Sequence, residues 1–285
     1  MIVVTGATGK LGQHVIEGLL KKVPAAQIVA AVRSPEKAAN LAVLGVQLRK
    51  ADYSDPQTLA SAFAGAEKVL LISSSEVGVR VAQHQSVIDA AKAAGVKLLA
   101  YTSILRADTS TLALAVEHLA TEKALKASGI PYTLLRNGWY LENHTESLGA
   151  ALQHGAILGA AQDGKFAAAS RKDYALAAVA VLTTEGHADK TYELAGDAAF
   201  TLTELAAEVS HAANKPVVYK NLPEADYETA LKGFGLPAEI AHILADSDAG
   251  AAKGELDSNS RDLHNLLGHA TTTLTAAVAA AVSKS

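Results

Sequence analysis

The chain of 285 residues contains no cysteine. This absence excludes disulfide bonds, zinc sites built from thiolates and cysteine nucleophiles, and it fits a cytoplasmic protein. The ten histidines are scattered and form no H-E-x-x-H motif, so we expect no metal site. Chemistry that depends on a thiolate or a bound metal is therefore not expected.

Long apolar runs and basic runs are also lacking. No apolar stretch approaches the length of a bilayer span, and a strand-like run begins at Met1, which leaves no room for a signal peptide. The 25 lysines and arginines are dispersed, and the formal net charge is -4. We therefore expect neither membrane insertion nor a nucleic-acid-binding surface. A homodimer is compatible with the sequence.

The most informative feature that is present lies at the amino terminus. The apolar residues 1–4 predict a buried strand, and Gly6, Gly9 and Gly12 follow with the spacing G-x-x-G-x-x-G, leading into a helical pattern from Leu11. Glycine allows a sharp turn and a close approach to a pyrophosphate, and the N–H groups of the helix N-terminus face the anion. This order predicts a dinucleotide cradle, and a tight turn without a ligand is the alternative.

The rest of the first half alternates strand-like runs with helical segments. Further strands are expected at 28–32, 46–49, 68–72, 96–102 and 132–135. Helices are expected from Ser34-Pro35 to about residue 45, from Asp55-Pro56 to about residue 65, and at 77–94 and 111–128. This alternation predicts an α/β fold, a doubly wound parallel (Rossmann) sheet with right-handed crossovers.

After Arg136 the alternation stops, and the second half predicts a smaller, mainly helical C-terminal cap. Helices are expected at 139–154, 171–183, from the capping box Thr201-x-x-Glu204, and at 224–232, 238–245 and 273–282, with strands at 192–194 and 217–219 and a loop at 246–260. We assign 1–136 to the dinucleotide-binding (Rossmann) domain, with 165–196 returning to the sheet. Residues 137–164 and 197–285 are assigned to the substrate-binding cap.

The end of the second strand decides which nicotinamide cofactor binds. Sites that bind NAD place a carboxylate there for the ribose 2′-hydroxyl, whereas this chain has Val32-Arg33-Ser34. Arg33 can form a forked contact with the 2′-phosphate of NADPH, and Lys10 adds a second positive charge. The pattern favours NADPH, with a solvated arginine at a strand end as the alternative.

Two further strand ends are candidate cofactor contacts. Asp52 can accept a hydrogen bond from the exocyclic amine of adenine, and the ring of Tyr53 can pack beside the base. Ser73, Ser74 and Ser75 are small enough to let the cofactor pass at the end of the fourth strand. An ordinary loop and an ordinary polar turn are the respective alternatives.

The chain also lacks the Tyr-x-x-x-Lys pair with which short-chain dehydrogenases reduce simple ketones. Lys123 is present, and Leu119 occupies the position of the tyrosine. A quinone that accepts hydride becomes a phenolate, whose affinity for a proton is like that of tyrosine, with a pKa of about 10. Solvent can complete that protonation, so the missing tyrosine indicates a conjugated acceptor or no chemistry at all.

The segment that follows the sixth strand is a candidate substrate region. The backbone at Asn137 and Gly138 can form a wall for the nicotinamide, and Trp139 or Tyr140 can offer a flat contact to a planar substrate. Three polar residues follow and are candidates to orient a substrate oxygen: Asn143, His144 and Ser147. Core packing of the aromatics, and helix capping or simple exposure of the polar residues, are the alternatives.

Taken together, these residues resemble the atypical short-chain dehydrogenase superfamily in its NmrA-like branch. The segments that carry the resemblance are 4–9, 71–76, 100–103, 121–123 and 134–140. The resemblance extends over essentially the whole chain, and the last of these segments is its most specific part. It implies NADPH bound along the carboxyl edge of the sheet, reduction of a quinone, and a cap formed by the C-terminal half.

The resemblance also implies which positions would do this work. The cofactor would contact Gly6, Ala7, Thr8, Gly9, Lys10, Leu11, Arg33, Ser73, Ser74, Ser75, Asn137, Gly138, Trp139, Tyr140, Leu141 and Asn143, with Lys123 near the ribose. Together with Asp52 and Tyr53 these are the expected cofactor residues. The expected catalytic positions are Lys123, Tyr140 and Asn143.

Two functional hypotheses remain open at this point. The favoured one is an NADPH:quinone oxidoreductase, in which hydride passes from the nicotinamide to a bound quinone. The alternative is a non-catalytic NADP(H)-binding redox sensor that reports the state of the cofactor to a protein partner. A sugar-nucleotide epimerase is disfavoured because that chemistry normally needs the tyrosine acid–base.

Overall fold

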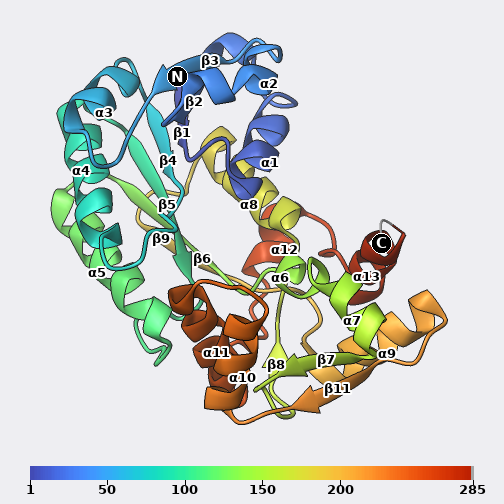
Figure 1. Cartoon of the computed structure of the whole chain (residues 1–285). Coiled ribbons are helices and arrows are strands. Elements are labelled where there is room, and N and C mark those ends of the chain that lie inside the picture. Colours follow the sequence, from blue (N-terminus) through green and yellow to red (C-terminus); the bar gives the residue numbers. More distant parts are fainter. Residues whose placement is uncertain (284–285) are drawn as a thin grey trace. The chain divides into compact units, whose positions relative to one another are not determined.

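The computed structural model describes residues 1–283, and the chain forms two compact units (Figure 1). Unit 1 comprises residues 1–107, 116–137 and 171–193. Unit 2 comprises residues 108–115, 138–170 and 194–283. Each unit is therefore assembled from stretches that are separate in the sequence.

Unit 1 is built on a seven-stranded sheet in the order β3-β2-β1-β4-β5-β6-β9. The strands are β1 (Ile2–Thr5), β2 (Ile28–Val32), β3 (Gln47–Lys50), β4 (Lys68–Leu71), β5 (Leu98–Ile104), β6 (Tyr132–Asn137) and β9 (Lys190–Leu194). Every neighbouring pair from β3 to β6 is parallel. The strand order reverses between β1 and β4, the switch point at which doubly wound sheets bind their ligands. The predicted fold class is confirmed.

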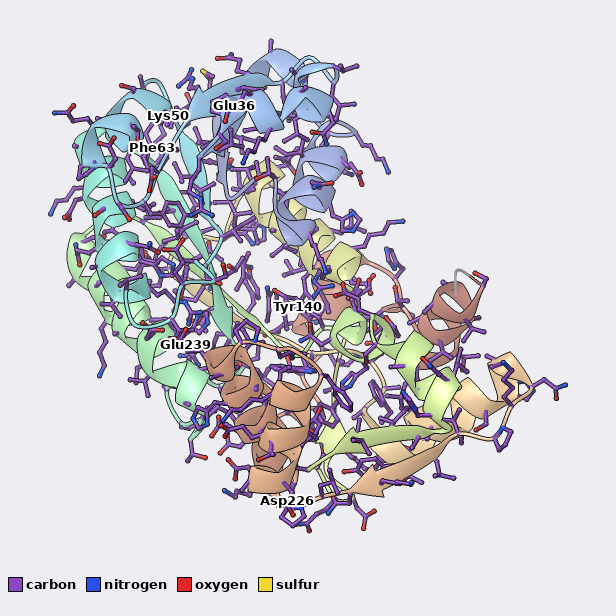
Figure 2. The ribbon with its side chains drawn as sticks, viewed as in Figure 1. Glu36, Lys50, Phe63, Tyr140, Asp226 and Glu239 are labelled. Atoms are coloured by element: carbon purple, nitrogen blue, oxygen red, sulfur yellow. The ribbon has the colours of Figure 1, made fainter. Side chains whose placement is uncertain are left out.

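Helices cover both faces of this sheet (Figure 1). They are α1 (Lys10–Leu19), α2 (Ala39–Ala42), α3 (Pro56–Ala62), α4 (Arg80–Ala93), α5 (Ala113–Ser128) and α8 (Arg171–Thr183), with 3₁₀ turns at η1 (Ala25–Gln27) and η2 (Pro35–Lys37). Helices α1 and α8 pack together on one face, and α3, α4 and α5 lie on the other. Phe63, which follows α3, is fully buried in the same apolar cluster as Val3 and Leu71 (Figure 2). Burial of both faces explains the almost purely apolar strands β1, β2 and β4.

Unit 2 is mainly helical. Its helices are α6 (Leu141–Thr145), α7 (Leu148–His154), α9 (Leu202–Ala213), α10 (Glu224–Gly233), α11 (Ala238–Ala251), α12 (Asp262–Leu267) and α13 (Leu274–Val282). Two small sheets pair β7 (Ala156–Gly159) with β11 (Val218–Asn221) in parallel and β8 (Lys165–Phe166) with β10 (Phe200–Thr201) antiparallel. The predicted capping box of α9 is confirmed, because the Glu204 N–H donates to Thr201 Oγ1 and the Thr201 N–H donates to the Glu204 carboxylate.

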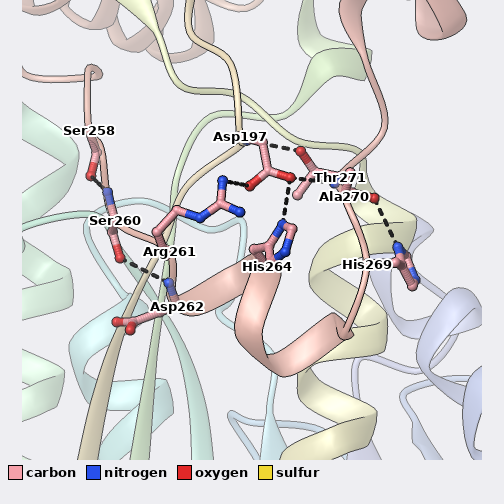
Figure 3. Close-up of polar contacts among 9 residues, drawn as sticks. All are labelled: Asp197, Ser258, Ser260, Arg261, Asp262, His264, His269, Ala270 and Thr271. Carbon is pink, nitrogen blue, oxygen red and sulfur yellow. Dashed lines mark hydrogen bonds and ion pairs between the residues drawn. The ribbon is translucent and has the colours of Figure 1, made fainter.

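A polar cluster joins three segments of unit 2 (Figure 3). The carboxylate of Asp197 accepts from Arg261 at 2.8 Å, lies 3.0 Å from Nδ1 of His264, and accepts from the N–H of Thr271 at 2.9 Å. In return, the Asp197 N–H donates to the Thr271 hydroxyl. The loop before β10 is thereby tied to α12 and to the segment before α13.

The expected helix from Ser34 to residue 45 is wrong. The segment forms the 3₁₀ turn η2 and the single-turn helix α2, and Ser34 makes no side-chain cap. Within η2 and α2 only Leu41 is buried. So short an apolar face gives little tertiary support to a longer helix.

Two expectations for unit 2 are also wrong. The expected helix over 139–154 is divided into α6 and α7, because Ser147 has φ -101° and ψ 5° and interrupts the helical conformation. The expected loop over 246–260 begins only after α11 ends at Ala251. The polar residues that indicated a loop are held by tertiary contacts, since Asp246 accepts from the N–H of Ala113 and Asp248 accepts from the N–H of Ala160.

Across residues 1–283, no helix combines the length and the apolar character that crossing a bilayer would require.

Candidate functional site

The turn between β1 and α1 has the backbone geometry of a phosphate cradle. Gly6 has φ +59°, a conformation that favours glycine. A Cβ on Gly12 would lie 2.3 Å from the carbonyl oxygen of Gly6, so α1 can approach the turn this closely only with glycine there. Gly9 caps α1 without a side chain, and the first turn of the helix carries no acidic residue. Within residues 1–283, no side chain caps the N-terminal N–H groups of α1, and a helix N-terminus of this kind is suited to binding an anion.

The hydroxyl of Tyr53 bridges the carboxyl ends of β1 and β4 at the switch point. This hydroxyl lies 2.5 Å from Thr5 Oγ1 at the end of β1 and 2.8 Å from the carbonyl oxygen of Ile72 after β4. Burial raises the pKa of Tyr53. Asp52 closes its own turn by accepting a hydrogen bond from the N–H of Ser54 at 2.9 Å. The contacts of Asp52 and Tyr53 with adenine remain predictions.

Arg33 follows β2 as expected and has a partner that the sequence did not suggest. Its Nη1 donates to Oε1 of Glu76 at 2.8 Å, and 69% of the Arg33 side chain is exposed. An exposed ion pair of this kind contributes little to stability, typically ~0–1 kcal/mol. The guanidinium can therefore exchange its carboxylate partner for a phosphate at small cost.

Residues Ser73 to Ser75 form a loop whose backbone is held by three side chains from two elements, β5 and α4. Thr102 on β5 accepts from the N–H of Ser73 at 2.9 Å, and His84 on α4 accepts from the N–H of Ser74 at 2.9 Å. The Nε group of Arg80 donates to the carbonyl oxygen of Ser74 at 2.7 Å. The loop at the carboxyl end of β4 is thus rigidly placed beside the switch point.

The hydrogen bonds of His84 define its tautomer. Because Ser74 donates to Nε2, the ring proton is on Nδ1, which donates to Thr121 Oγ1 at 2.9 Å. The Thr121 hydroxyl in turn donates to the carbonyl oxygen of Glu117. Burial, together with the nearby guanidinium of Arg80, lowers the pKa of His84 to about 3, so the ring is neutral at physiological pH.

The α5 helix separates buried polar residues from Lys123. His118, Thr121 and Glu122 are buried, and Glu122 binds the buried Arg136 of β6 through both carboxylate oxygens at 2.9 and 2.7 Å. Lys123 is exposed and lies on another side of the helix. Its expected place near the ribose remains a prediction.

The segment that was expected to form the nicotinamide wall spans a unit boundary, since Asn137 belongs to unit 1 and Gly138 starts the second stretch of unit 2. The N–H of Gly138 donates to the carbonyl oxygen of Leu194, and that of Leu141 donates to the carbonyl oxygen of Ala169. Trp139 is 9% exposed and belongs to the core. Tyr140 caps α6 with an extended backbone and is half-buried (Figure 2). Backbone hydrogen bonds to Leu194 and Ala169 thus fix the position of this segment.

The three candidate substrate residues differ in their surroundings. His144 lies edge-on to two stacked rings, with centroid distances of 4.8 Å to Phe166 and 5.5 Å to Phe200. Its Nε2 is buried and accepts or donates no hydrogen bond within residues 1–283, and burial lowers the pKa of His144 to about 4. Asn143 is half-buried one position earlier. Ser147 is exposed and donates to the carbonyl oxygen of His144.

Several residues that hold the candidate site were missed by the sequence analysis. Arg80, Gln83 and His84 are all buried on α4. Their spacing of i, i+3 and i+4 places them on one helix face with Val87 and Ile88, which are also buried. Polar residues in register with an apolar helix face were the available signal, and no signal in the sequence paired Arg33 with Glu76.

A doubly wound sheet with an uncapped glycine turn at its switch point defines a dinucleotide-binding protein. The NmrA-like family matches residues 1–271. The chain belongs to this family, as its sequence resemblance implied.

Relatives with known names cover nearly the whole chain. Quinone oxidoreductase 2 of Escherichia coli (strain K12) is 60% identical over 278 residues, which cover 98% of this chain and 97% of the relative. The crystal structure of the E. coli NADPH-dependent quinone oxidoreductase QOR2 complexed with NADPH has a TM-score of 0.96 and 60% identity, covering 98% of this chain and 99% of that chain. A Citrobacter sp. triphenylmethane reductase complexed with NADP(H) has a TM-score of 0.95 and 43% identity, covering 99% and 100% respectively.

Proposed function

We propose that this protein is an NADPH-dependent quinone oxidoreductase. The observation that carries the proposal is the 60% identity, over 98% of the chain, to an E. coli enzyme that bears this name and whose structure contains NADPH. The likeness to the NmrA regulator, at 15% identity, extends to the fold alone. The enzyme is therefore better supported than the redox sensor.

The residues of unit 1 fit the cofactor. We assign the pyrophosphate to the N–H groups between Gly6 and Leu11. Helix α1 approaches the glycine turn closely, and within residues 1–283 no side chain caps its N-terminus. We assign the 2′-phosphate to Arg33, whose exposed guanidinium pairs with the exposed carboxylate of Glu76. The loop of Ser73 to Ser75 then lines the path of the cofactor along the carboxyl edge of the sheet.

The bound nicotinamide would supply the hydride, and the residues of this chain would place the acceptor. Tyr140, Asn143, His144 and Ser147 are our candidates on the substrate side, with Lys123 near the ribose. Neutral His144 can hydrogen-bond a quinone oxygen without carrying a charge into an apolar site. The reduced quinone leaves as a phenol-like product that protonates from water, so no tyrosine acid is needed.

The wider assignments follow from the same proposal. Unit 1 corresponds to the NADP-binding domain and unit 2 to the substrate-binding cap. The small-molecule partner is a quinone. We place the protein in the cytoplasm, in keeping with a chain that contains no cysteine.

The test is NADPH consumption by the purified protein across a panel of small quinones. We expect oxidation of NADPH that depends on the quinone and on the protein, with a much lower rate when NADH replaces NADPH. A heat-denatured sample controls for the direct reaction of NADPH with quinones. Absence of turnover with every quinone, together with different affinities for NADPH and NADP⁺, would instead support the redox sensor.

A further inference from the structure

The guanidinium that we assign to the 2′-phosphate already faces a carboxylate. Arg33 Nη1 lies 2.8 Å from Glu76 Oε1, and 69% and 46% of the two side chains are exposed. Arg33 follows β2, and Glu76 belongs to the loop after β4, 43 residues later. No acidic residue directly follows β2, but the loop after β4 places the carboxylate of Glu76 beside Arg33 at the end of β2.

Glu76 is held in this place by a buried neighbour. Its second oxygen, Oε2, accepts from Gln83 Nε2 at 2.8 Å, and Gln83 is only 7% exposed. The backbone N–H of Glu76 donates to Ser74 Oγ at 3.1 Å. Because a carboxylate can only accept, the Gln83 amide must present its nitrogen to Glu76. The carboxylate is thus fixed beside Arg33 rather than free to turn into solvent.

We propose that Glu76 is a specificity-determining residue that lowers the preference of the site for NADPH over NADH. The inference rests on the proposed function, because it takes Arg33 as the ligand of the 2′-phosphate. A phosphate monoester carries a charge of about -1.5 to -2 at neutral pH, so a carboxylate on the same guanidinium repels it and competes for the same donors. The 2′-hydroxyl of NADH has no charge and can donate to a carboxylate.

The two side chains therefore act in opposite directions on one ribose. Arg33 favours the phosphate of NADPH, and Glu76 favours the hydroxyl of NADH. The Glu76→Gln substitution keeps an acceptor for Gln83 and removes the charge. We expect the ratio of the dissociation constants, Kd(NADH)/Kd(NADPH), to rise by about 2- to 5-fold, the range for an exposed charge partly screened by solvent.

The measurement is a fluorescence titration of the full chain with NADPH and with NADH at low and high salt. The rise in the ratio should shrink at high salt, because the effect is electrostatic. Glu36→Gln is the matched control. It removes the same charge from an exposed residue of the turn η2, three positions after Arg33 (Figure 2), and should leave the ratio unchanged.

Arg33→Ala, alone and combined with Glu76→Gln, completes a double-mutant cycle. We expect Arg33→Ala to weaken NADPH binding by about 10-fold or more. If Arg33→Ala leaves NADPH binding unchanged, the assignment of the phosphate itself is wrong. If Arg33→Ala weakens binding but Glu76→Gln leaves the ratio unchanged or lowers it, only the role of Glu76 is overturned. Melting temperatures within a few degrees of wild type verify that each variant is folded.

Discussion

Asp248 on α11 is a buried carboxyl group of unit 2. It is 6% exposed, and its Oδ2 accepts a hydrogen bond from the N–H of Ala160 at 2.9 Å. Burial raises the pKa of Asp248 to about 7, and the hydrogen bond from Ala160 opposes this rise only in part. Near neutral pH this carboxyl group is therefore divided between its two protonation states.

The raised pKa makes the stability of the folded protein depend on pH. The unfolded chain loses the proton near pH 4. The folded chain keeps the proton on Asp248 up to about pH 7. The stability that this proton gives the folded state is therefore fully present below the pKa of the unfolded chain, and it is lost as the pH rises through the pKa of the folded chain. We expect Asp248→Asn, which keeps an acceptor for Ala160 and cannot ionise, to be more stable than wild type at pH 8 by on the order of 2–4 kcal/mol.

Urea denaturation at pH 5 and pH 8 measures this difference. Wild type should lose stability between the two pH values more steeply than Asp248→Asn. Asp246→Asn, two residues earlier on α11, is the matched control and should not reduce the pH dependence. Parallel pH profiles for wild type and Asp248→Asn would contradict the prediction.

At the scale of single elements, the junction of β1 with α1 depends on close backbone contact. A Cβ on Gly12 would lie 2.3 Å from Gly6 O and 2.7 Å from Ala7 Cα, and backbone atoms cannot move aside as a side chain can. We expect Gly12→Ala to displace the start of α1 and to reduce the free energy of unfolding by about 1–3 kcal/mol. NADPH binding should weaken with it, because the N–H groups of the cradle move.

Gly149→Ala is the matched control for this substitution. Gly149 lies in α7, and apart from the backbone of α7 itself no atom of residues 1–283 lies within 4 Å of the position that its Cβ would take. Alanine is a better helix former than glycine, so this variant should be more stable by about 0.5–1 kcal/mol. Chemical denaturation and NADPH titration of both variants provide the comparison. Unimpaired NADPH binding by a folded Gly12→Ala protein would show that the cradle does not need this close approach.

Elements with strong local signals were predicted well. Helix α8 (Arg171–Thr183) and the helix start at Asp55-Pro56, where Asp55 accepts from the N–H of Gln57, are confirmed. The α11 helix was cut short because Asp246, Ser247 and Asp248 resemble a loop in sequence. In the fold, two of these three accept hydrogen bonds from residues more than 80 positions away. Local propensity cannot anticipate such distant partners.

At the scale of the whole molecule, cofactor binding should appear as a gain in stability. A ligand that binds only the folded state at 100 times its Kd adds about 2.7 kcal/mol at one site. We therefore expect saturating NADPH to raise the unfolding midpoint by several degrees, about 2–4 °C per kcal/mol for a chain of this size. NADH at the same concentration should raise the midpoint less.

Differential scanning calorimetry measures both shifts and resolves the transitions of the two units if they unfold separately. Inorganic pyrophosphate at the same concentration is the control for non-specific anion effects. Equal midpoints with and without NADPH would contradict the assignment of unit 1 as the cofactor-binding unit.

The sequence alone determined the alternation of strands and helices, the glycine turn and the absence of an acid at the end of β2. Each of these rests on residues that are neighbours along the chain, so backbone sterics and the period of the apolar pattern were sufficient. The tertiary structure decided that Glu76 faces Arg33, that His84 holds Ser74 and that Asp248 is buried against Ala160. These contacts join separate elements, and their geometry exists only after the elements have packed.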